Sequence, residues 1–204
     1  MKKISFTVSF LALSMMIIVY SCNRDQKTAS PGSTDDSVQV NLAGFETPEK
    51  YGEHLVLIAG CHDCHTPKKM TDKGPEIDFS LALSGHPAQL PPPEVNRKEM
   101  ESKGHVVTQT LTAWVGPWGI SYAANLTPDE TGLANWEESN FFTALRKGKH
   151  KGVESERSLL PPMPWDMYKN MTDQELRAVF AYLRSIKPVK NIVPQPVPPV
   201  TARP

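Results

Sequence analysis

The spacing of apolar residues predicts a helix at about residues 48–59. Four apolar side chains share one helical face there: Tyr51, Leu55, Ile58 and Ala59. The residues TPE at the start of this segment supply a hydrogen-bonding N-cap, a proline for the first helical position and an acidic residue near the positive end of the helix. The segment runs directly into residues 60–66, whose sequence is GCHDCHT.

A second amphipathic helix is predicted near the C-terminus. Thr172 and Glu175 are spaced as a capping box, and the apolar residues that follow repeat at helical intervals: Leu176, Val179, Phe180 and Leu183. Pro188 ends the segment. Two such helices that cross beside the GCHDCHT segment would form most of a hydrophobic core.

Residues 137–147 predict a shorter third helix, with Phe141 and Leu145 on its inner face and Gly148 as its C-terminal cap. The stretch 66–134 shows little periodicity. Loops of that length are uncommon in a compact domain unless something else supplies a core for them to wrap. We therefore predict an all-α fold with helices and long loops around a large apolar cofactor.

The N-terminal segment has the pattern of an export signal. Lys2 and Lys3 precede an apolar stretch that is short for a membrane-spanning helix, and the stretch ends in VYSC at Cys22. This ending resembles the lipobox of bacterial lipoproteins, in which the cysteine is lipidated and becomes the first mature residue. The alternative is an ordinary cleaved signal followed by a free cysteine. We expect an exported protein, anchored by lipid at Cys22 to a bacterial membrane and facing the periplasm or the cell exterior.

Composition divides the chain into four parts. Residues 1–21 form the predicted signal peptide, 22–44 are polar and turn-rich as in a flexible tether, 45–190 form the domain, and 191–204 are a proline-rich tail or strap. The formal net charge is zero, which gives no reason to expect a nucleic-acid partner. No internal repeat and no second CxxCH sequence is present.

The GCHDCHT segment raises three possibilities: a redox dithiol, half of a zinc site or a haem anchor. The chain has three cysteines, and lipidation of Cys22 would leave Cys61 and Cys64. Two thiols and one histidine fall short of the four ligands of a structural zinc site. No strand-helix-strand pattern surrounds the motif, as a thioredoxin-like protein would require.

Haem attachment accounts for all three side chains. Cys61 and Cys64 have the spacing that allows each thiol to form a thioether with one vinyl group of a single haem, and His65 then supplies the proximal iron ligand. We therefore predict one covalently attached haem c.

The order of motifs resembles that of a class I c-type cytochrome. The similarity covers roughly residues 45–196 and rests on CHDCH, NLTPDETG, LLPPMPW and the terminal helix ending in AYLRS. The nearest resemblance is to cytochrome domains that accept electrons from membrane-associated alcohol and aldehyde dehydrogenases. Those subunits usually carry three haem domains, whereas this chain has one motif. The segment 67–112 is also longer than in a minimal cytochrome c, and no role is assigned to it.

The resemblance implies a methionine as the distal iron ligand, on a loop before the last helix. Met163 occupies that place, and the prolines around it restrict its backbone. Met167 and Met171 are competitors, of which we expect one to pack in the core and the other to be partly exposed. Four histidines are further alternatives, each expected to have an ordinary structural or solvated role: His54, His86, His105 and His150.

An iron held by His65 and Met163 has both axial positions filled, which favours electron transfer over catalysis. The predicted function is single-electron transfer between exported or membrane-bound partners, such as a dehydrogenase or a terminal oxidase. One alternative is a haem enzyme, peroxidase-like or thiosulfate-oxidising, whose sixth ligand is labile. Another is a structural or sensing haem lipoprotein.

Overall fold

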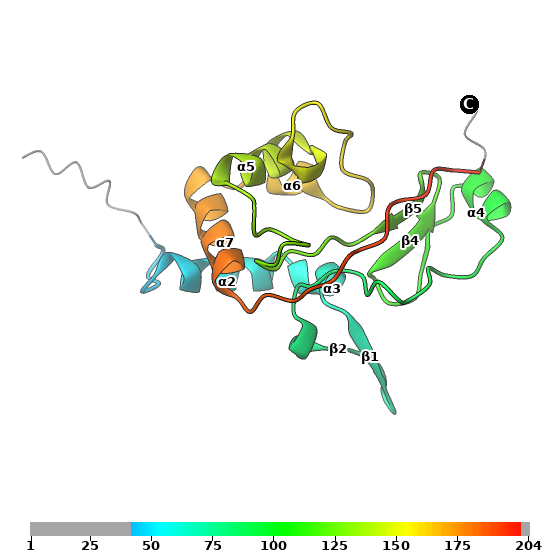
Figure 1. Ribbon diagram of the computed structural model, residues 1–204, viewed down its shortest axis with the longest axis horizontal. Helices are drawn as coiled ribbons and strands as arrows, with labels where there is room; N and C mark the ends of the chain where they lie inside the picture. Colours follow the sequence, from blue (N-terminus) through cyan, green and yellow to red (C-terminus); the bar gives the residue numbers. More distant parts are fainter. Residues whose placement is uncertain (1–41, 201–204) are drawn as a thin grey trace, which may run out of the picture. The chain divides into compact units, whose positions relative to one another are not determined.

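The computed structural model describes residues 42–200 of the chain. Cys22 and the predicted signal peptide lie outside the described residues. The helices are α2 (Pro48–Ile58), α3 (Cys61–His65), α4 (Arg97–Lys103), α5 (Glu138–Lys147), α6 (Trp165–Tyr168) and α7 (Asp173–Ser185), with short 3-10 turns η1 (Phe79–Leu81) and η2 (His150–Gly152) (Figure 1). The strands are β1 (Lys68–Thr71), β2 (Gly74–Ile77), β3 (Val107–Thr108), β4 (Ala113–Gly116) and β5 (Gly119–Tyr122).

Local side-chain bonds start the two long helices as the sequence predicts. The Thr47 hydroxyl accepts from the Lys50 backbone N–H at 3.2 Å at the start of α2. At the start of α7, Thr172 accepts from the Glu175 N–H, and the Glu175 carboxylate accepts in return from the Thr172 N–H. These caps satisfy backbone groups that a helix terminus otherwise leaves unpaired.

Helices α2 and α7 cross at Gly52. A Cβ atom at this position would lie 1.9 Å from the Ala178 carbonyl oxygen, so the two backbones approach too closely for any larger residue. The crossing buries Leu55 and Val56, whereas Ile58, expected on the inner face, is 65% exposed. Ile58 lies in the last turn of α2, six residues after the crossing at Gly52.

The hydrophobic core lies between α2, α5 and α7. Its buried residues are Leu55, Val56, Leu83, Leu133, Phe141, Leu176, Ala178, Val179 and Leu183. Phe141 from α5 stacks on Phe180 from α7 with ring centroids 5.2 Å apart, and Leu145 is partly buried against the same cluster. The predicted third helix is therefore present, with the inner face that the sequence indicated and with Gly148 as its cap.

The segment predicted as loops contains antiparallel strands. β1 and β2 form a hairpin, and β3, β4 and β5 form a three-stranded sheet in which Trp114 is opposite Ser121. The term all-α therefore does not cover this part of the molecule. None of these strands exceeds four residues, too short for an alternating pattern to identify them.

The C-terminal segment crosses the three-stranded sheet of β3, β4 and β5, called the inserted sheet below, as an extended strap. Its backbone exchanges two hydrogen bonds between Val197 and Ile120 in β5. Beyond this point Arg97 in α4 donates to the Pro198 carbonyl, and the Val200 N–H donates to Glu101 at 2.7 Å. Within residues 42–200, no helix has the length and apolarity needed to cross a membrane.

Candidate haem site

Helix α3 presents the two thiols and the imidazole together. Gly60 joins α2 to α3 with a φ of 68°, in the left-handed region that glycine adopts without strain. Cys61, Cys64 and His65 follow at helical positions i, i+3 and i+4, which place them on one side of the short helix. Both cysteines are free thiols and are partly buried.

One nitrogen of His65 is engaged and the other is available. The ring is 8% exposed, and Nδ1 donates to the Ala124 carbonyl oxygen at 2.8 Å. Burial lowers the pKa of His65, so the ring is neutral and Nε2 carries the lone pair. Among the described residues Nε2 makes no hydrogen bond. A buried, neutral imidazole held through Nδ1 is the arrangement of a metal-ligating histidine.

The thiols do not have the character of a redox dithiol. Burial raises the pKa of Cys61 to about 11 and raises that of Cys64 as well. Catalytic CxxC thiols instead have lowered pKa values, because the thiolate is the nucleophile. The described residues also contain no group of three or more His, Cys, Asp or Glu side chains suited to a metal ion. The residues on α3, two thiols with raised pKa values and one imidazole, therefore fit covalent haem better than a redox dithiol.

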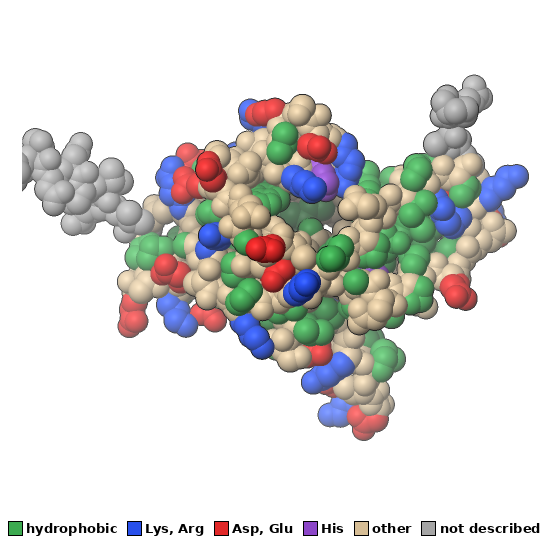
Figure 2. All heavy atoms as spheres, in the orientation of Figure 1, with side chains coloured by type: hydrophobic (Ala, Val, Ile, Leu, Met, Phe, Trp, Pro, Cys, Tyr) green, Lys and Arg blue, Asp and Glu red, His purple; other side chains and the backbone are tan. Residues whose placement is uncertain are grey.

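Tyr168 connects the methionine-bearing region with the end of α2, just before the CHDCH helix. Its hydroxyl in α6 donates to the Ala59 carbonyl oxygen at 2.7 Å, two residues before Cys61. Burial, together with the nearby Cys61 and Cys64, raises the pKa of Tyr168 to about 12, so the hydroxyl retains its proton. Figure 2 shows a hollow below α6 with hydrophobic side chains in its depth.

The three candidate methionines lie in different environments. Met163 is half-buried in the loop before α6, Met167 in α6 is 67% exposed, and Met171 packs against the hydrophobic core. The expected difference between Met167 and Met171 is therefore present. Ligation by Met163 stays a prediction.

The histidines outside the motif differ from one another, and one expectation was wrong. His86 was expected to be solvated, but it is fully buried: Nε2 donates to the Leu90 carbonyl and Nδ1 accepts from the Thr112 hydroxyl. Both ring nitrogens are therefore occupied by hydrogen bonds. A polar loop sequence carries no signal of this burial, which depends on residues more than 20 positions away. His105 is exposed, as expected, and His54, one turn from Tyr51 on α2, is exposed as well.

A network missed by the sequence analysis holds the loop that carries Ala124. Asn125 is 4% exposed and donates to Val189 and Thr131, while its amide oxygen accepts from the N–H and the hydroxyl of Thr127. This network fixes the position of the Ala124 carbonyl and, through it, the ring of His65. The NLTPDETG motif was recognised, but the contact of the residue before it, Ala124, with His65 was not.

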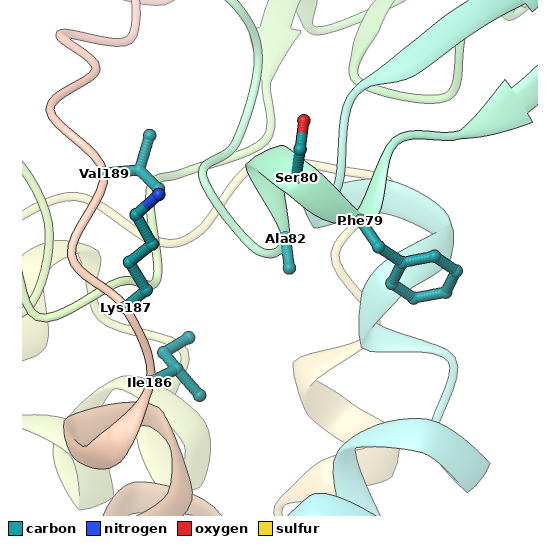
Figure 3. A pocket seen from close by; sticks show the side chains of 6 residues that line it. All are labelled: Phe79, Ser80, Ala82, Ile186, Lys187 and Val189. Atoms are coloured by element: carbon teal, nitrogen blue, oxygen red, sulfur yellow. The ribbon is translucent and has the colours of Figure 1, made fainter.

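A shallow pocket lies between η1 and the segment after α7 (Figure 3). It is lined by Phe79, Ser80, Ala82, Ile186, Lys187 and Val189. The lining contains no cysteine, histidine or methionine, so it offers no thiol for haem attachment and no imidazole or methionine sulfur for iron.

Comparison with known proteins is consistent with this site. The family model described as cytochrome c matches residues 50–187. The chain is 35% identical over 141 residues to the fructose dehydrogenase cytochrome subunit of Gluconobacter japonicus, which covers 68% of this chain and 21% of that protein. It is 37% identical over 79 residues to a subunit of the nicotinate dehydrogenase of Pseudomonas putida, covering 38% of this chain and 6% of that protein.

A third relative is the cytochrome c subunit of the quinone alcohol dehydrogenase of Gluconacetobacter polyoxogenes. The identity is 34% over 82 residues, or 39% of this chain and 17% of that protein. The chain thus spans about a fifth or less of the length of these curated relatives. The family match, in contrast, covers more than half of this chain and includes α3 and the helices packed beside it. The chain therefore belongs to the cytochrome c family, whose members bind haem c covalently.

Proposed function

We propose that this chain carries one covalently bound haem c and passes single electrons between exported redox proteins. The observation that carries the proposal is the arrangement on α3, where two free thiols accompany a buried imidazole. Nδ1 of that imidazole is bonded to Ala124, and Nε2 is left for a metal ion. Haem c uses both thiols and the imidazole, and it supplies a one-electron iron couple when bound.

His65 and Met163 are the proposed axial ligands. The bond from His65 Nδ1 to the Ala124 carbonyl orients the ring and increases the basicity of Nε2. Met163 would contribute a thioether, which raises the reduction potential relative to a second histidine. The bond between Tyr168 and Ala59 supports this assignment because it holds α6, which directly follows Met163, against the end of α2.

The location and partners of the protein are also proposals. Lipidation of Cys22 would anchor the domain to a bacterial membrane, on the periplasmic or outer face. The fructose and alcohol dehydrogenase relatives are named as cytochrome subunits, so a dehydrogenase is the proposed electron donor. A terminal oxidase or another membrane redox protein is the proposed acceptor.

The proposal is tested by haem content and by ligand challenge of the purified protein. The pyridine haemochrome assay should give one haem per chain. Carbon monoxide added to the reduced protein, and peroxide added to the oxidised protein, should leave the absorption spectra nearly unchanged because both axial positions are filled. A rapid spectral change with peroxide would instead favour the peroxidase-like enzyme, and a haem content near zero would contradict both functions.

A further inference from the structure

A directed chain of hydrogen bonds leads from the inserted sheet to the loop that carries Met163. Ser121 in β5 is 5% exposed, and its hydroxyl lies 2.6 Å from the Pro161 carbonyl oxygen. A carbonyl only accepts, so Ser121 donates its hydrogen there. The Trp118 indole N–H donates to the same hydroxyl oxygen at 2.9 Å. The chain of bonds therefore runs from Trp118 through Ser121 and ends two residues before Met163.

The loop around Met163 has few hydrogen-bond donors of its own. Pro161, Pro162 and Pro164 lack a backbone N–H. The Met163 N–H bonds within the loop, to the Leu160 carbonyl at 3.3 Å. The bond from Ser121 joins this loop to an element distant in the chain. It therefore restrains a segment that has too few backbone N–H groups to form regular hydrogen bonds of its own.

Strand β5 is a firm support for such a restraint. On one edge it pairs with β4, where Ile120 is opposite Val115, and on the other edge Ile120 exchanges backbone hydrogen bonds with Val197 of the strap. Figure 1 shows the C-terminal segment running along this sheet. Pairing on both edges leaves β5 less free to move than the edge strand of a two-stranded hairpin.

The same stretch of chain also reaches the proximal side. Ala124 follows Ser121 by three residues, and its carbonyl accepts from His65 Nδ1. One short segment thus bonds to the loop of the proposed distal ligand through Ser121 and to the proposed proximal ligand through Ala124.

We propose that Ser121 is a positioning residue that holds Met163 in place as the distal iron ligand, with the inserted sheet as its support. This inference rests on the proposed function. Without the bond, the loop of residues 160–164 would sample positions in which the thioether leaves the iron more often.

The test uses full-length holoprotein and imidazole, which competes with Met163 for the oxidised iron. The variants are Ser121→Ala, Ser121→Thr and Trp118→Phe. The control is Thr108→Val, which removes a hydroxyl that donates to the Ala113 carbonyl and accepts from the Leu111 N–H beside the same sheet, without a hydrogen bond to residues 160–164. Imidazole affinity is measured by absorption titration, and the free energy of unfolding is measured for each variant by denaturant titration.

Ser121→Ala should raise imidazole affinity roughly three- to tenfold, the range expected for loss of one hydrogen bond. Ser121→Thr should restore the wild-type value because it keeps the hydroxyl. Trp118→Phe should also raise imidazole affinity, but by less than Ser121→Ala does. Thr108→Val should lose about as much stability as Ser121→Ala and leave imidazole affinity unchanged.

The inference would be overturned if Ser121→Ala kept the wild-type imidazole affinity while it lost as much stability as Thr108→Val. Ser121 would then be purely structural. If Ser121→Ala yields no holoprotein, Trp118→Phe decides, and unchanged affinity in that variant overturns the inference. The oxidised wild-type spectrum separates the ligand assignment of Met163 from the positioning role of Ser121. Absence of the weak far-red band of iron–methionine bonding would contradict the ligand assignment itself, and the role of Ser121 with it.

Discussion

The two sides of the proposed haem site are held in different ways. On the proximal side His65 is 8% exposed, lies in a helix and donates to a backbone carbonyl that the Asn125 network fixes. On the distal side Met163 is half-buried in a proline-rich loop, whose bond to a distant element comes from Ser121. The proposed proximal ligand is thus buried and hydrogen-bonded within a helix, whereas we propose that the distal ligand depends on the inserted sheet. A cytochrome organised in this way should lose its distal ligand more readily than its proximal ligand.

The largest expected effect comes from removing the proximal ligand. His65→Ala should yield little or no holoprotein, because the imidazole is the one buried group of the CHDCH helix that is oriented for iron. Met163→Ala should retain one covalent haem per chain, since both thiols and His65 remain. The pyridine haemochrome assay measures both, and equal haem loss in the two variants would remove the proposed asymmetry.

Gly52→Ala tests the framework of the proximal side. The added Cβ would meet the backbone oxygen of Ala178, which cannot rotate away, so α2 and α7 must separate. We expect a loss of about 3 kcal/mol in the free energy of unfolding. Glu53→Ala, on the exposed face of the same helix, is the control and should change stability by about 0.5 kcal/mol or less. Similar values for the two variants would contradict the close crossing.

Asn125→Ala should weaken the support behind His65. The side chain makes four hydrogen bonds in a buried setting, and its removal leaves the Val189 carbonyl and the Thr127 N–H without this partner. A loss of about 2 kcal/mol is expected in denaturant unfolding. Asn170→Ala removes two hydrogen bonds of an exposed amide at the end of α6 and should cost far less. Equal costs would show that the network does not hold the loop.

Thr172→Ala should produce the smallest change. It removes the capping bond to the Glu175 N–H at the exposed start of α7, which is worth about 1 kcal/mol. Thr172→Ser keeps a hydroxyl and should be close to wild type. Neither variant should alter imidazole affinity, because the cap lies on the framework rather than on the loop of Met163. A change in that affinity would mean that α7, and not the inserted sheet, controls the distal ligand.

Sequence predicted the helical part of the fold because its signals are local. The capping box of Thr172 and Glu175 and the apolar stripe after it lie within one segment, and both are present in the structure. The sheet was missed because its strands are too short to show a period, and β5 is held by Val197, far along the chain. His86 was misplaced for the same reason, since its burial depends on Thr112.

In the candidate site, too, local features could be predicted from the sequence and tertiary contacts could not. Cys61, Cys64 and His65 could be proposed from the sequence because their spacing within five residues matches the chemistry of one haem. The partners of those residues could not be identified. Ala124, Ser121 and Tyr168 reach the site through tertiary contacts, and nothing in their own neighbourhood distinguishes them from other small or polar residues.

The most direct test of the central claim is the far-red absorption of the oxidised protein, where iron–methionine bonding gives a weak band. We predict that the wild type shows this band, that Met163→Ala loses it, and that Met167→Ala, which changes the exposed methionine four residues away, retains it. A wild type without the band, or a Met163→Ala variant that keeps it, would contradict ligation by His65 and Met163.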